Sequence, residues 1–76
     1  MPDAGRRLRD VSPERAIRAF ERLGYEVVRV RGSHYILKHP GRATLSIPRH
    51  RTVKVGLLLS KIKAAGIKAE DFEEML

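Results

Sequence analysis

The chain has 76 residues, no cysteine and a net charge of +7, from 16 Lys and Arg against 9 Asp and Glu. A chain this short forms one small domain that buries only about 60% of the surface of its unfolded chain, so a deep pocket is not expected. The lack of cysteine excludes a disulfide framework, a thiol nucleophile and a thiolate zinc site. No apolar run reaches the roughly 18 residues of a membrane-spanning helix and the N-terminus resembles no secretory signal, so we expect a cytoplasmic protein with no membrane partner.

The positive charge is concentrated in the middle of the chain. No acidic residue lies between Glu26 and Glu70, whereas Lys and Arg recur throughout this stretch, which also holds all three histidines. Solubility alone is served by interspersed charges of both signs. An acid-free basic stretch is instead typical of a surface that binds a polyanion, and we expect such a partner.

Residues 1–11 contain few apolar side chains and are predicted to form a flexible basic tail, with the folded domain over residues 12–76. A helix is predicted over about residues 13–23. Ser12 suits the N-cap, Pro13 the first helical position and Gly24 the C-terminal cap. Apolar residues recur between them at spacings of three and four, as in an amphipathic helix.

Three strands are predicted next, at about residues 25–31, 34–39 and 43–47, because the apolar period falls to two and short Gly and Pro turns separate the runs. They form an antiparallel meander. The residues assigned to the helix side are Val28, Val30, Tyr35, Leu37, Leu45 and Ile47, and those assigned to the open side are Arg29, Arg31, His34, Ile36, Lys38, Thr44 and Ser46. The opposite register would bury His34 and Lys38 and expose Tyr35 and Leu37, which is energetically costly.

Residues 48–54 are predicted to form a basic loop, for which phosphate binding and a solvated connection are equally consistent. A second helix follows at about residues 55–65, and a short third helix runs from Ala69 to Met75. The apolar stripe of the second helix consists of Val55, Leu58, Leu59, Ile62 and Ala65, and the exposed face of the third consists of Glu70, Asp71, Glu73 and Glu74. Strands grouped between helices predict an α+β fold with both long helices on one face of the sheet.

His34 is the candidate catalytic residue. Imidazole has an ordinary pKa of about 6.5, which suits proton transfer near neutrality, and RNA cleavage requires such a transfer while cations hold the phosphate. Gly32 would let a phosphate approach the backbone, and Ser33 offers a hydroxyl donor. The predicted RNA-binding residues are Arg29, Arg31, Gly32, Ser33, Lys38, Arg49, Arg51 and Lys54. A lone histidine is more often structural than catalytic, but placement on a basic face weakens that alternative.

Neither a metal nor another cofactor is expected. The three histidines, His34, His39 and His50, are spaced by five and eleven residues, which fits no usual zinc motif. Alternation places His34 and His39 on opposite faces of the sheet, and no carboxylate lies between them in the sequence.

Short motifs follow one another in a distinctive order over residues 12–76. They are Leu23-Gly24-Tyr25, Arg31-Gly32-Ser33-His34-Tyr35-Ile36, Lys38-His39-Pro40, Ile47-Pro48 with His50 close behind, Leu58 to Ala65-Gly66-Ile67, and Glu70-Asp71-Phe72. Together they resemble the HicA toxins, also named YcfA-like proteins. The resemblance implies a fold similar to the double-stranded RNA-binding domain, a ribonuclease acting on messenger RNA, and neutralisation by a HicB antitoxin encoded beside it. The catalytic histidine of the family follows a Gly-Ser pair, which here makes it His34.

The chain departs from the family pattern at two helix starts. Val55-Gly56-Leu57 stands where members usually carry Pro-Gly-Thr or a close relative, and Lys68 stands where a capping Ser or Thr is common. Two other functions stay open: a non-catalytic module that binds double-stranded RNA by shape, and a purely structural interaction protein. The second catalytic group also stays open between Lys38, His50 and Ser33.

Overall fold

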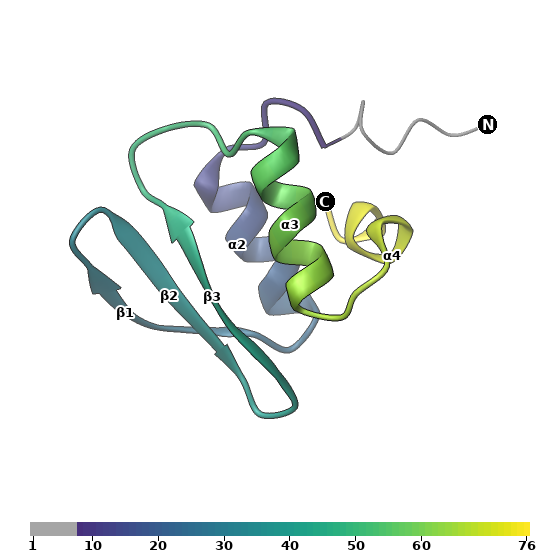
Figure 1. Ribbon diagram of the computed structural model, residues 1–76, viewed down its shortest axis with the longest axis horizontal. Coiled ribbons are helices and arrows are strands. Elements are labelled where there is room, and N and C mark those ends of the chain that lie inside the picture. The colour runs from purple at the N-terminus through teal and green to yellow at the C-terminus, as the bar shows by residue number, and fades with distance from the viewer. Residues whose placement is uncertain (1–7) are drawn as a thin grey trace.

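The computed structural model describes residues 8–76, which form three helices and three strands joined by short connections (Figure 1). In chain order the elements are α2 (Pro13–Arg22), β1 (Glu26–Arg31), β2 (His34–His39), β3 (Arg42–Pro48), α3 (Val55–Ala64) and α4 (Ala69–Glu74). The part of the predicted tail at residues 1–7 lies outside the described residues. No helix within residues 8–76 has both the length and the apolar character needed to cross a membrane.

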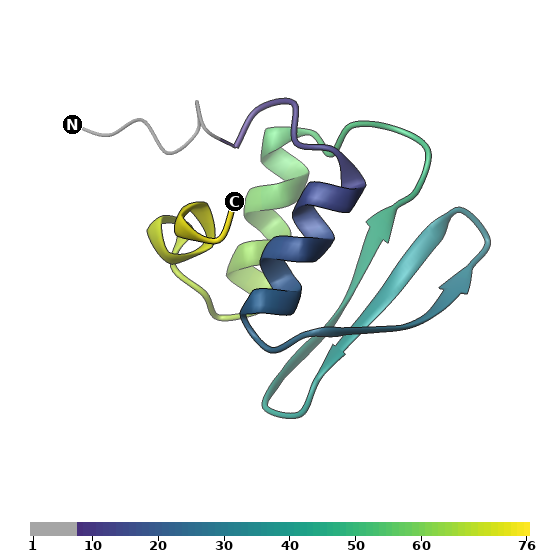
Figure 2. The same ribbon diagram turned by 180° about the vertical axis from the view of Figure 1, so that it is seen from behind.

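The strands form one antiparallel sheet in the order β1-β2-β3. α2 and α3 lie side by side on one face of this sheet, and Figure 2 shows the same arrangement from behind. α4 packs against α2 and α3 on the side away from the sheet. The predicted α+β architecture, similar to the double-stranded RNA-binding domain, is therefore confirmed.

Local chemistry explains the helix ends. The Ser12 hydroxyl accepts a hydrogen bond from the amide of Arg15 at 3.2 Å, as an N-cap residue does. Gly24 ends α2 with a φ of +101°, a backbone conformation that only glycine adopts readily. α3 and α4 begin after Lys54 and Lys68, which provide no side-chain cap. Both helices therefore form at the positions where the chain departs from the family pattern, although neither start has a side-chain cap.

An aromatic cluster joins α2, the sheet and α4. The ring of Phe20 is fully buried, with its centroid 5.5 Å from that of Tyr25 and 4.6 Å from that of Phe72. Burial of a side chain such as Phe72 contributes about 1.5–3 kcal/mol, which holds in place a six-residue helix too short to be stable alone. The other large side chains that are fully buried are Leu8, Val11, Leu37, Ile47, Val53, Leu58 and Ile62.

The segment before α2 is part of the core. Leu8 and Val11 have no exposed surface, and the amide of Val53 donates to the carbonyl oxygen of Val11 at 2.9 Å in an isolated antiparallel bridge. The prediction that residues 8–11 belong to a flexible tail is therefore wrong. Two apolar side chains in a basic segment are enough to anchor it once the rest of the fold provides a surface to cover.

A β-bulge in β1 changes which valine faces the helices. Val27 pairs with Leu37 and Arg29 pairs with Ile36, so Val28 is an extra residue between two pairs. Val27 packs against the core, whereas Val28 is 43% exposed, so the predicted inward position of Val28 is wrong. Val30 pairs with Tyr35, on the helix side as predicted, but it is 47% exposed because β1 is an edge strand.

A second irregularity, between β2 and β3, directs Arg42 toward the helices. His39 pairs with Arg42, so two residues of β3 lie opposite Lys38. The Nη1 atom of Arg42 donates to the carbonyl oxygens of Ala65 and Gly66, at 2.8 and 3.1 Å. These are carbonyls that the end of α3 leaves unpaired, and a cation there also interacts favourably with the helix dipole.

The C-terminal helices differ from their predicted faces at two positions. Leu59, expected in the apolar stripe of α3, is 38% exposed, and the buried residues of this stripe are Leu58, Ile62 and Ala65. Glu73, expected on the exposed face of α4, is only 5% exposed. A short helix that packs against both α2 and α3 has more than one of its sides covered, which period-based reasoning did not anticipate.

Replacement of Leu8 by alanine tests the packing of the N-terminal segment. Because the side chain is fully buried, we expect the free energy of unfolding to fall by about 2–5 kcal/mol. The neighbouring exposed residue supplies the control, since Arg9→Ala should change the free energy of unfolding by no more than about 0.5 kcal/mol. Urea denaturation followed by circular dichroism measures both, and equal stability of the two variants would contradict the assignment of Leu8 to the core.

Candidate active site

A two-residue turn presents His34 at the start of β2. β1 ends at Arg31 and β2 begins at His34, so Gly32 and Ser33 form the whole connection. Gly32 has a φ of +59°, in the left-handed region that tight hairpin turns require. A Cβ atom built on Gly32 would meet nothing within 4 Å, so the glycine is needed for its backbone conformation and leaves open space beside the turn.

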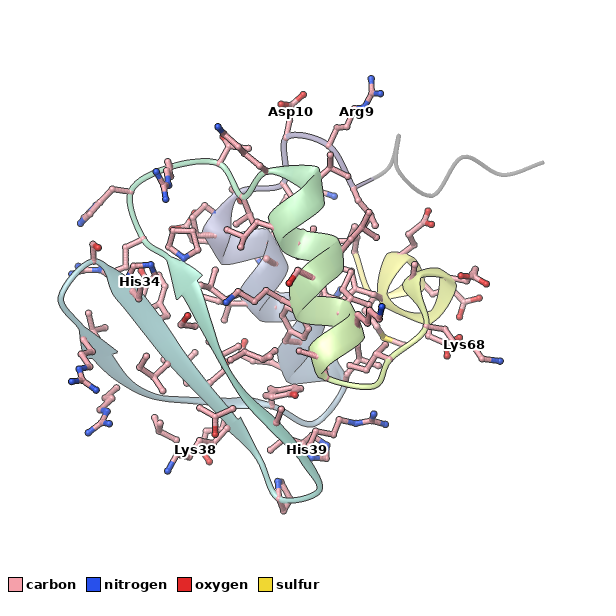
Figure 3. The ribbon with its side chains drawn as sticks, in the orientation of Figure 1. Arg9, Asp10, His34, Lys38, His39 and Lys68 are labelled. Atoms are coloured by element: carbon pink, nitrogen blue, oxygen red, sulfur yellow. The ribbon has the colours of Figure 1, made fainter. Side chains whose placement is uncertain are left out.

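The sheet register places His34 on the face opposite the helices. Leu37 is fully buried and Tyr35 packs against the core, so strand alternation directs His34 to the other side. His34 pairs with Arg31 on β1 and with Pro48 on β3. The residue is half-buried, and it lies at the end of the sheet next to the β1–β2 turn (Figure 3). The predicted register of the middle strand is confirmed.

His34 lines a small surface pocket of about 240 Å³. The pocket is formed by two segments, the β1–β2 turn and the loop after β3, and its lining residues are Ser33, His34, Pro48, His50 and Arg51. The hydroxyl oxygen of Ser33 lies 3.4 Å from Nδ1 of His34, within reach of a weak hydrogen bond. The Ser33 hydroxyl therefore lies on the Nδ1 side of the imidazole, away from Nε2.

Arg49 connects the two segments that form the pocket. Its amide donates to the carbonyl oxygen of Ser33 at 2.8 Å, and its Nη1 donates to that of Gly32 at 3.2 Å. The guanidinium carbon lies 5.7 Å from the ring centroid of Tyr35, and the Nε atom is buried. These contacts show that the side chain of Arg49 helps to hold the turn that carries His34. That Arg49 binds RNA stays a prediction.

The other predicted site residues divide by their distance from His34. Arg31 is its partner across β1, and Arg29 lies on the same face opposite Ile36. Lys38 is four residues along β2, or about 13 Å at 3.3 Å per residue, and Figure 3 shows it near the other end of the strand. The structure therefore brings Ser33 and Arg31 close to His34 and leaves Lys38 apart.

A larger pocket of about 650 Å³ adjoins the first through a shared residue. Arg51 lines both pockets, and Lys54 lines the larger one. The complete lining is Arg9, Asp10, Arg51, Thr52, Lys54 and Val55. Arg9 was missed by the sequence reasoning because its segment was assigned to the flexible tail. Burial of the neighbouring Leu8 places Arg9 at the larger pocket.

His39 has a structural environment away from this site. Its Nδ1 accepts a hydrogen bond from the amide of Gly41 at 2.9 Å, and its ring centroid lies 5.1 Å from that of Tyr25. A Cβ atom on Gly24 would approach Nε2 of His39 to 2.7 Å, so the imidazole is tightly packed. His34 and His39 lie at opposite ends of β2 (Figure 3) and do not converge on a common ligand.

The electrostatic environment of the pocket is cationic. Arg31 and Arg51 lie near His34, and no acidic residue occurs between residues 27 and 69 of the sequence. An imidazole beside fixed positive charges, on a face open to a large molecule, can exchange a proton while the cations hold a phosphate.

Comparison with known protein families gives a match over most of the described residues. A family model described as the HicA toxin of bacterial toxin-antitoxin systems matches residues 14–67, which include both segments of the pocket. The chain belongs to the HicA toxin family. No curated protein matches it. The HicA match ends before α4 and begins after Leu8 and Val11, so packing at both ends lies outside the matched region.

Substitution of Arg49 tests whether its side chain stabilises the β1–β2 turn of this HicA protein. Arg49→Ala removes one hydrogen bond and one cation–ring contact, so we expect unfolding to require about 1–2 kcal/mol less free energy. Arg51→Ala removes an exposed cation from the same loop and should lower the free energy of unfolding by no more than about 0.5 kcal/mol. Chemical denaturation of both variants measures the difference. An Arg49→Ala protein as stable as Arg51→Ala would show that the side-chain contacts of Arg49 contribute nothing to stability.

Proposed function

We propose that the chain is the toxin of a type II toxin–antitoxin system and acts in the cytoplasm as an endoribonuclease on messenger RNA. The observation that carries this proposal is the position of His34. Its imidazole lines an open pocket with Ser33 and Arg51, on the sheet face that the helices leave uncovered. Membership in a toxin family supports a harmful activity, and the cationic pocket supports RNA as its target.

In the proposed mechanism, His34 is the catalytic acid or base. One proton must leave the 2′-hydroxyl of the ribose or reach the departing oxygen, and Nε2 of His34, on the side of the ring away from Ser33, can carry it. Arg31 and Arg51 are the cations placed to hold the phosphate, and the open space beside Gly32 admits it close to the backbone. The proposed step uses only these side chains.

The RNA path extends from this pocket in two directions. Along the sheet it would pass Arg29 and Lys38, and along the loop it would pass Arg51 to the larger pocket lined by Lys54. Phosphate binding by several such side chains is electrostatic and independent of base sequence. Arg49 contributes by holding the turn.

A non-catalytic module that binds double-stranded RNA is the second candidate function. The observation that favours it is the fold, because the same helix and sheet arrangement recognises RNA duplexes by shape. The two functions differ in whether the histidine is needed for a chemical step.

Replacement of His34 separates the two functions. Removal of a general acid or base typically slows catalysis by about 100-fold or more, so His34→Ala should lose cleavage of a labelled RNA to that extent. Because RNA affinity depends on the cations, binding of the same RNA should change by less than about 3-fold. His39→Gln, a histidine substitution on the same strand but outside the pocket, should cleave at the wild-type rate. Cleavage by His34→Ala as fast as by the wild type would refute the catalytic assignment.

We also propose that a HicB-like antitoxin inhibits the enzyme by covering His34 and the basic sheet face. The pocket is open to the surface, so occupation of the face by another protein is the most direct route to inhibition. The basic residues Arg31 and Arg51 near His34 favour a partner that presents acidic side chains.

Hydrogen exchange tests the position of the antitoxin. Amides in residues 29–36 and 49–51 should be protected in the complex with the protein encoded beside the toxin, because these segments form the face and the pocket. Amides in α4 provide the internal control, since this helix lies on the other side of α2 and α3 from the sheet. An inhibited complex in which residues 29–36 exchange as fast as in the free toxin would rule out this mode of inhibition.

A further inference from the structure

The pocket that contains His34 also contains a second histidine from a distant part of the sequence. His34 comes from the start of β2, whereas His50 comes from the loop after β3. The other lining residues are Ser33, Pro48 and Arg51. Of these five side chains only the two imidazoles exchange a proton readily near neutral pH, because arginine stays charged and serine stays protonated.

The fold holds His50 beside His34 through the strand pairing that precedes it. Pro48 is buried and pairs with His34, and the next residue, Arg49, donates its amide to the carbonyl oxygen of Ser33. His50 follows directly after these two anchors. Its side chain is exposed, so a large substrate that contacts His34 can reach it as well.

The other candidates for a second proton-transfer group are less well placed. Lys38 is about 13 Å along β2 from His34 and pairs with Glu26. Ser33 lies in the pocket, but its hydroxyl contacts Nδ1 of His34 and does not titrate near neutrality. His39 is at the far end of β2 and packs against Tyr25.

We propose that His50 is a second catalytic residue, which performs the proton transfer opposite to that of His34 during RNA cleavage. The inference rests on the proposed ribonuclease function and adds the group that completes it. Cleavage by the neighbouring 2′-hydroxyl requires both a base for that hydroxyl and an acid for the leaving oxygen, and two imidazoles in one pocket meet both needs.

The chemical step balances with these two groups alone. One imidazole takes the proton of the 2′-hydroxyl as the 2′-oxygen forms a bond to phosphorus. The bond from phosphorus to the 5′-oxygen breaks, and that oxygen takes a proton from the other imidazole, which enters the step protonated. The products are a 2′,3′-cyclic phosphate and a 5′-hydroxyl, and proton exchange with water restores both histidines.

Among the described residues, the arginines that line the pocket or pair with His34 are cationic. Arg31 lies opposite His34 on β1, Arg51 lines the pocket, and Arg49 holds the turn from the β3 side. The charges of Arg31 and Arg51 are placed to bind the phosphate and to stabilise the charge that develops on its oxygens, so the histidines are left to transfer protons.

The experiment uses the whole chain and an RNA oligonucleotide whose cleaved bond has first been mapped with the wild-type enzyme. Single-turnover rates are measured between pH 5 and 9 for the wild type, His34→Ala, His50→Ala and the control His39→Gln. The same rates are then measured with sulfur in place of the 5′-oxygen at that bond. A thiolate leaves without being protonated, so this substrate bypasses the general acid.

We expect the cleavage rate of the wild type and of His39→Gln to depend on pH as a bell-shaped curve. For His50→Ala we expect the rate to fall by about 100-fold or more, and either the acidic or the alkaline limb of the curve to disappear. One of the two alanine variants, and only one, should recover on the sulfur substrate, and that variant lacks the acid. The proposal is overturned if the pH–rate curve of His50→Ala keeps both limbs, or if this variant loses only affinity for RNA. It is also overturned if neither alanine variant regains its cleavage rate on the sulfur substrate. Full activity of His50→Ala beside an inactive His34→Ala would overturn this role alone, whereas a wild type that cleaves no RNA would overturn the proposed function as well.

Discussion

Burial of alternate residues in β2 determines where the candidate catalytic group lies. Leu37 is inside the core, and its partners Val27 and Leu45 point to the same side. A shift of one residue would place an imidazole and an amine under the helices, at a cost of several kcal/mol for groups without partners there. The hydrophobic core thus selects the face on which His34 lies, although none of the apolar residues of the core cluster lines the pocket.

The site depends equally on a connection between two segments that are distant in sequence. Antiparallel pairing brings the end of β3 beside the start of β2, and Arg49 extends that pairing by one hydrogen bond and fastens the turn through its side chain. A loop held in this way keeps its side chains in a defined position relative to His34. Geometry of this kind is what acid–base catalysis requires, because proton transfer falls off steeply when the groups are misplaced.

Much of the architecture was predictable from the sequence, because helix caps, strand alternation and Gly turns are local signals. The face of His34 followed from the same alternation. The inward position of Val28 was predicted incorrectly, since the bulge inserts an extra residue that no local sequence motif indicates. The packing of Leu8 depends on a surface made by segments far along the chain, and no period reveals it.

The sequence was least informative about how the basic residues divide their tasks. Arg49 and Arg51 are equivalent in a charge pattern, yet one is fastened to the turn and the other lines two pockets. His50 was one of three open candidates for a second catalytic group, and only the three-dimensional arrangement distinguishes it from Lys38. The charge pattern predicts a polyanion partner but does not indicate which basic residues would contact it.

The bulge at Val28 also bears on how the protein behaves at high concentration. β1 is an edge strand with two exposed valines, and an unpaired edge of this kind is a template for the strands of other chains. Arg29 and Arg31 interrupt its apolar side chains with like charges, and the bulge breaks the regular spacing of its amides and carbonyls. The irregularity that rotates one valine out of the core thereby protects the sheet against edge-to-edge aggregation.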